Sequence, residues 1–130
     1  FPSYLNGTAT AIHVSGKAFR KPGWVLISTY AEHKGDQFNL RRENRQWLHR
    51  KIFAVSLEDT PKIYSIANAD SEHFYPQLPE GMNDSANYWL EPHATVNQDF
   101  TRILFNSGWN RMNGEVDNFM IALPKNALPD

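Results

Sequence analysis

The sequence contains no cysteine, which excludes a disulfide framework, a thiolate zinc site and a cysteine nucleophile. It also has no run of the roughly 20 apolar residues that a membrane-spanning helix needs, so we expect no membrane partner. Neither charge sign is in excess, since 13 basic and 14 acidic side chains give a net charge of −1. A globally basic nucleic-acid-binding protein is therefore not expected.

Several catalytic motifs are missing as well. The 130 residues include no glycine-rich phosphate loop, no HExxH metalloprotease motif and no GxSxG nucleophile motif. These absences argue against dinucleotide-dependent enzymes, kinases, zincins and α/β-hydrolases. Aromatic residues, in contrast, make up 13% of the chain, which suits a β-rich domain or one that stacks on sugar rings.

Short apolar runs separated by turn residues predict a single all-β unit over residues 1–130. Turn signals such as Lys21-Pro22-Gly23 and Asn113-Gly114 fall between the runs. The clearest expected strands are Trp24–Tyr30, Lys51–Leu57, Lys62–Ala67, Arg102–Ser107 and Val116–Leu123, and two weaker ones are Thr10–Ala18 and Tyr88–Val96.

The expected strands repeat within the chain. The segment WVLIST (24–29) aligns with RILFNS (102–107), and IFAVSL (52–57) aligns with NFMIAL (118–123). The repeat predicts a four-stranded antiparallel unit over residues 8–68 and a second, incomplete unit over residues 88–124. Such units in tandem are typical of β-propeller blades. A seven-stranded β-sandwich would have almost the same number of strands and is the alternative.

The segment from Glu91 to Ser107, EPHATVNQDFTRILFNS, resembles a hairpin of TolB-like propellers. That family pattern is approximately His-x-x-(apolar)-Ser-Pro-Asp-Gly-(Thr/Lys)-x-(apolar)-(apolar)-Phe-x-Ser, and here Asn97-Gln98-Asp99-Phe100 replaces Ser-Pro-Asp-Gly. Among such propellers, the chain looks most like oligogalacturonate lyases and related polysaccharide lyases. The resemblance implies a seven-bladed ring with histidines around its channel, in some cases binding a metal, and a secreted or periplasmic enzyme.

The chain would supply only two of these blades. We therefore expect either the C-terminal part of a longer propeller or several copies that assemble to close a ring. The open flanks of the two end blades would be apolar, so a stable monomer is not expected.

Two long connections, Ala31–Arg50 and Asn68–Asn87, should lie at the same end of the sheet in such a meander. The first is locally basic, and Arg41, Arg42 and Arg45 could bind an anionic polysaccharide or oligosaccharide bidentately. The cluster should then approach the histidines of the first strands. A solvated surface loop and a contact between subunits or blades are the alternative interpretations.

His13 and His93 are the candidate general bases or ligands of a divalent metal, and Glu91 is a candidate third ligand. Glu91 lies two residues from His93 and should point to the same side of a strand. We expect all three on innermost strands, with the histidines facing a polar cavity. The alternative is structural histidines bonded to backbone carbonyls. Tyr30 is a reserve base.

These residues predict part of a carbohydrate-active propeller that cleaves a uronic-acid polysaccharide by β-elimination. An arginine or a metal would neutralise the uronate carboxylate, a histidine or Tyr30 would take the C5 proton, and Trp89 would stack on a sugar ring. The residue that protonates the leaving oxygen is not identified. The rival hypotheses are a non-catalytic binding or assembly module and a fragment without activity. Trp24 and Trp109 are expected in the core.

Overall fold

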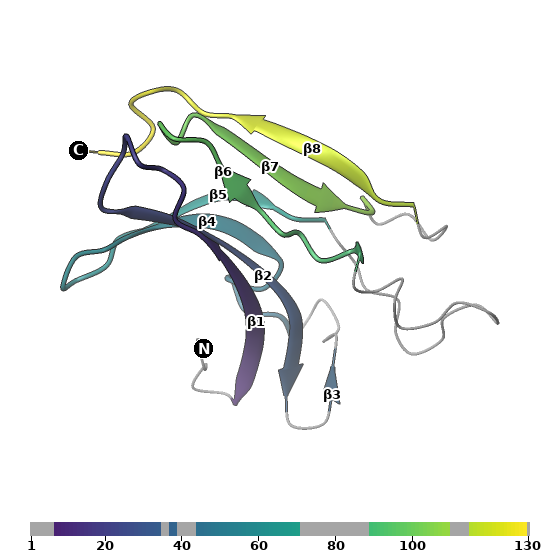
Figure 1. Ribbon diagram of the computed structural model, residues 1–130. Helices are drawn as coiled ribbons and strands as arrows, with labels where there is room; N and C mark the ends of the chain where they lie inside the picture. The colour runs from purple at the N-terminus through teal and green to yellow at the C-terminus, as the bar shows by residue number, and fades with distance from the viewer. Residues whose placement is uncertain (1–6, 35–36, 39–43, 71–88, 110–114, 130) are drawn as a thin grey trace.

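The protein consists of two antiparallel β-sheets that lie one above the other in the computed structural model (Figure 1). The structure describes residues 7–34, 37–38, 44–70, 89–109 and 115–129. In these residues the prediction of an all-β fold of antiparallel strands is confirmed. In the same residues no helix has the length and apolar character needed to cross a membrane.

The first sheet is a four-stranded meander with a short fifth strand beside it. Its order is β1-β2-β4-β5, and β3 pairs with the far end of β2. Pro22 and Gly23 lie in the turn between β1 and β2, where Gly23 adopts a φ of 85° just before β2 begins, a conformation that glycine tolerates best. The strands are β1 (Thr8–Ser15), β2 (Trp24–Lys34), β3 (Gln37–Phe38), β4 (Lys51–Ser56) and β5 (Ile63–Asn68).

The second sheet is a three-stranded meander, β6-β7-β8, built from β6 (Thr95–Val96), β7 (Arg102–Ser107) and β8 (Asp117–Ala122). The turn between β6 and β7 is closed by side chains. The Asn97 Oδ1 atom accepts hydrogen bonds from the backbone amides of Thr101 and Arg102, both at 2.9 Å. Asp99 accepts one from the Thr101 hydroxyl at 2.6 Å, and this bond lowers the pKa of the Asp99 carboxyl.

Phe100 occupies an unusual position in this turn. Its φ of 60° is a left-handed conformation, and the resembling family pattern has glycine at this place. The side chain is nevertheless buried in the core between the sheets. Burial of a phenylalanine side chain contributes roughly 1.5–3 kcal/mol, which offsets a backbone strain of about 1–3 kcal/mol.

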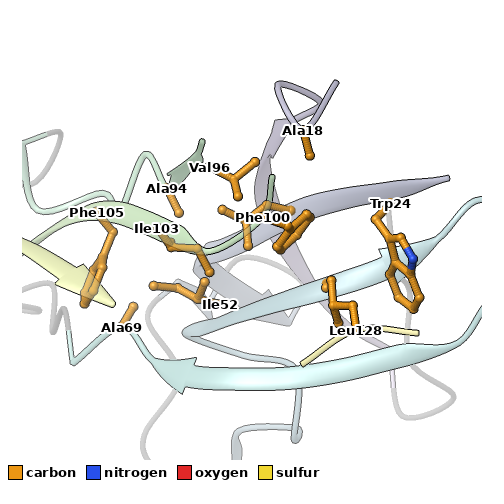
Figure 2. Packing of buried hydrophobic residues seen from close by; sticks show 12 residues of the cluster. Ala18, Trp24, Ile52, Ala69, Ala94, Val96, Phe100, Ile103, Phe105 and Leu128 are labelled. Carbon is orange, nitrogen blue, oxygen red and sulfur yellow. The ribbon is translucent and has the colours of Figure 1, made fainter. Parts of the chain in front are cut away.

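The hydrophobic core lies between the facing sides of the two sheets (Figure 2). Trp24 closes one end of it, and its indole N–H donates to the carbonyl of Pro129 at 3.2 Å. Trp109, predicted to be in the core, is instead exposed and stacks on Phe119. The prediction for Trp109 was wrong because this residue follows the end of β7 and leaves the sheet. The core side chains include Leu26, Ile52 and Ala54 from the first sheet and Val96, Phe100, Ile103 and Phe105 from the second part of the chain.

The first strands of the two sheets lie against each other. The Ser15 hydroxyl on β1 is 3.3 Å from the Thr95 hydroxyl and accepts a hydrogen bond from the Val96 amide at 3.4 Å. The Ser28 hydroxyl on β2 accepts one from the Ala94 amide at 3.2 Å. These bonds place the chain before β6 directly over the His13 region of β1.

Candidate metal centre

His13 enters the site from the regular part of β1, where it pairs with Ser28 of β2. Tyr30 lies on the same face of β2, two residues further along. The two rings stack with their centroids 4.5 Å apart and their planes 9° apart. The tyrosine ring thus covers one side of the imidazole and restricts its orientation.

Glu91 and His93 reach the same site from a loop, not from a strand. β6 begins only at Thr95, so the expectation that the two residues share a strand face was wrong. His93 has a φ of 43°, a left-handed backbone that turns the chain just before the strand. The carbonyl of Pro92, between them, accepts a hydrogen bond from the Asn106 amide at 2.8 Å, which fixes the loop to β7.

The three side chains converge although Glu91 and His93 are distant from His13 in the sequence. The Glu91 Oε2 atom is 3.0 Å from the His13 Nε2 atom and 3.3 Å from the His93 Nε2 atom. The two imidazoles stack with centroids 4.0 Å apart. Their exposed side-chain fractions, 27% for His13, 14% for Glu91 and 33% for His93, leave each group half-buried and accessible.

This geometry fits a metal centre with two histidine ligands and one carboxylate. One ligand atom from each residue lies within 4.8 Å of the other two. In a tetrahedral zinc site, ligands about 2.0–2.1 Å from the ion are about 3.3 Å from one another, close to both measured Oε2–Nε2 distances. Three protein ligands with an open fourth position are typical of a catalytic site.

The electrostatics of the cluster favour neutral His93. Partial burial lowers the pKa of the His93 imidazole from its ordinary value of 6.5, and Coulomb repulsion from His13 lowers it further, while Glu91 acts in the opposite direction. Neutral His93 therefore predominates at pH 7. A neutral imidazole is the form that binds a metal ion or accepts a proton.

The two histidines line an open pocket of about 280 Å³ between β1 and the loop before β6. Lys17 also lines it, at the start of the turn that follows β1. Lys17 was not predicted as a site residue, although it lies four residues after His13, a spacing that puts two residues of an extended chain on the same side. The remaining lining residues are Val14, Ser15, Gly16, Ala94 and Thr95.

Of the three arginines predicted to bind an anionic glycan, the structure describes only Arg45. Arg41 and Arg42 lie outside the described residues. Arg45 makes an ion pair with buried Glu32, its Nε atom 3.0 Å from Oε1, and Arg50 binds the same oxygen at 2.8 Å. The predicted approach of Arg45 to the histidines is thus wrong, because a buried carboxylate on β2 holds it elsewhere.

The arginines lie on the opposite face of the first sheet. Successive residues of a strand point to opposite faces. Ser28 bonds to Ala94, so it faces the second sheet, as does its register partner His13. Thr29 bonds instead to the carbonyl of Leu48 on the other side of the sheet. A β-bulge at Ala31, which has a φ of 46°, shifts the register by one residue and turns Glu32, with Arg45 and Arg50, to that same side.

Trp89, the predicted sugar-stacking residue, lies outside this pocket. Its side chain is 61% exposed and lines a second open pocket of about 380 Å³, together with Asn106, Val116 and Asn118.

Comparisons of the chain with protein family models, with curated proteins and with solved structures found no match.

Proposed function

We propose that His13, Glu91 and His93 bind a divalent metal ion, and that the site belongs to a carbohydrate-active β-propeller that cleaves a uronic-acid glycan by β-elimination. One observation carries the proposal: three side chains of metal-ligating type, one from β1 and two from the loop before β6, meet beside an open pocket that the two histidines line. A half-buried histidine with a lowered pKa beside a pocket, as His93 is, is typical of functional sites.

The order of the strands supports the propeller. Two consecutive antiparallel meanders, β1-β2-β4-β5 and β6-β7-β8, stack face to face with their first strands adjacent. Neighbouring propeller blades have this arrangement, and their first strands surround the central channel. A site between β1 and the chain entering β6 would then face that channel.

The pocket offers groups for the steps of β-elimination. A bound divalent ion would act as a Lewis acid on the uronate carboxylate and so acidify the C5 proton. Lys17, a cation of the pocket wall, would pair with the same carboxylate and orient the sugar. If both histidines serve as ligands, Tyr30, stacked on His13, is the base that remains of those predicted from the sequence. Tyr30, acting as the phenolate, would take the C5 proton; the C5–H electron pair would form the C4=C5 double bond as the C4–O bond breaks, and the leaving oxygen would take its proton from water.

The test separates metal binding from catalysis. After treatment with a chelator, calorimetric titration with Zn²⁺ and Mn²⁺ should give one site per chain, and His93→Ala or Glu91→Gln should abolish it. Glu58→Gln, at an exposed carboxylate, and His73→Ala are the controls. Ultraviolet absorbance should then detect a metal-dependent unsaturated product on pectate, ulvan or alginate. Absent metal binding would refute the site.

A non-catalytic binding or assembly module is the second candidate function. It is favoured by the outward face of the second sheet, where Leu104 and Met120 are register partners and are 47% and 66% exposed. Such a patch is typical of a surface that another subunit or blade covers. Metal binding without turnover on any of the three polysaccharides would support this function.

A further inference from the structure

We propose that the pocket formed by Trp89, Asn106 and Asn118 is a second glycan subsite, which binds one pyranose ring through its faces and hydroxyl groups. The inference rests on the proposed function, because it assigns the ring to the same glycan whose carboxylate the metal centre would bind. This subsite would recognise an uncharged part of the glycan, which the metal centre does not bind.

The pocket is built on two paired strands. Asn106 of β7 and Asn118 of β8 are register partners, so both carboxamides lie on the outward face of the second sheet. Val116, just before β8, and Trp89 also line the pocket, which is open and has a volume of about 380 Å³. That volume is within the range of about 300–1,000 Å³ that is usual for small-molecule sites.

The lining chemistry matches a sugar ring. The exposed indole of Trp89 offers a flat apolar surface for the C–H face of a pyranose. Each asparagine carboxamide can donate two hydrogen bonds and accept others, which suits neighbouring hydroxyl groups. The described residues that line the pocket are all uncharged, which suits hydroxyl groups.

A short segment connects this pocket to the metal centre. Trp89 and Glu91 are two residues apart, a span of at most about 7 Å, which is comparable to the length of one or two sugar units. Leu90, between them, is fully buried and packs closely on Gly108. The contact leaves no room for a larger residue, since a Cβ at position 108 would lie 2.5 Å from the Leu90 Cδ2 atom. The contact at Gly108 and the bond from Asn106 to Pro92 hold both sites in a fixed relation.

The experiment uses a galacturonate oligosaccharide and its fully methyl-esterified, uncharged form as probes, titrated calorimetrically with excess chelator. The wild-type protein should bind the esterified probe, and Trp89→Ala and Asn118→Ala should each weaken binding about tenfold. Trp89→Phe should retain most of the affinity. Trp47→Ala, which removes another exposed tryptophan, is the matched control and should change nothing. Circular dichroism would verify the fold of each variant.

Each outcome decides the inference separately from the metal centre. Tryptophan-dependent binding of the esterified probe supports the subsite, even if the metal titrations fail. Equal affinity of Trp89→Ala and the wild type for this probe, or no binding of it by the wild type, overturns the subsite. Neither result changes the metal stoichiometry, which alone tests His13, Glu91 and His93.

Discussion

Among single residues, Glu91 has the most demanding position, since one carboxylate oxygen contacts two imidazoles. Both histidines could donate an Nε2 proton to this oxygen, or the oxygen and the two Nε2 atoms could bind one metal ion together. The charge of Glu91 favours protonated His93, while partial burial and the charge of His13 favour the neutral form. Burial and the like charge together outweigh the carboxylate.

We expect His93 to titrate below the ordinary histidine value of about 6.5 in a metal-free NMR titration. Between that value and the lowered pKa, the unfolded chain binds more protons than the folded protein. The free energy of unfolding should therefore fall as the pH drops through this window and not fall further below it, as far as His93 is concerned. Glu91→Gln should lower the His93 pKa again, and a higher pKa in this variant would contradict the electrostatic account.

The residues of the metal centre could be selected from the sequence, but their geometry could not. Residue type and the internal repeat identified His13, Glu91 and His93. The positive φ of His93, which brings the loop over β1, could not be read from the sequence, because only a small fraction of non-glycine residues adopt it, even though histidine tolerates it better than most. Arg45 was misassigned because a basic loop does not indicate which buried carboxylate its side chains will bind.

At the scale of elements, Glu32 fixes the segment 44–50 to the first sheet. Its carboxylate is fully buried, and it binds Arg45 and Arg50 from the segment that leads into β4. The Thr29 hydroxyl adds a bond to the Leu48 carbonyl and accepts one from the Lys51 amide at 2.9 Å. These contacts replace the regular ladder where β2 extends beyond the start of β4.

Glu32→Ala should therefore lower the free energy of unfolding by about 3–5 kcal/mol, because it leaves the Arg50 guanidinium buried without its counter-charge. Urea denaturation monitored by tryptophan fluorescence would measure the loss. Glu58→Ala is the control, since the exposed Glu58–Lys62 pair should contribute no more than about 1 kcal/mol. Equal effects of the two substitutions would show that Glu32 has no special role.

The apolar runs predicted the longer strands well, because β4, β7 and β8 alternate or concentrate apolar residues over their whole length. The short strands were not resolved by the same reasoning. β6 has two residues, although the run Tyr88–Val96 suggested more, since Pro92 and the left-handed His93 prevent regular pairing before Thr95. β3 lacks an apolar pattern that could identify it.

For the whole molecule, the outward face of the second sheet determines how copies or partners could meet. Leu104 and Met120 occupy its middle, while Asn106 and Asn118 lie two residues further along the same strands. A neighbour packed over the apolar pair would leave the asparagine pocket at its edge. A partner that covers Leu104 and Met120 would thus be compatible with glycan binding in the asparagine pocket.

We expect the chain to associate in solution into species larger than its 15.0 kDa monomer, because the exposed apolar pair favours burial against a partner. Sedimentation velocity at several concentrations would measure this. The double variant Leu104→Lys with Met120→Lys should shift the population to monomer without changing the circular dichroism. A wild-type protein that sediments as a monomer at all concentrations would contradict the assembly and favour a self-contained β domain.

The metal ligands come from β1 and from the loop that enters the second sheet, and this origin has one more consequence. His13 belongs to β1, whereas Glu91 and His93 enter with the second sheet. An ion that binds all three residues cross-links the two sheets, and its binding free energy stabilises their packing. Metal binding and separation of the two sheets are then linked, because any opening that moves the sheets apart also breaks the site and releases the ion.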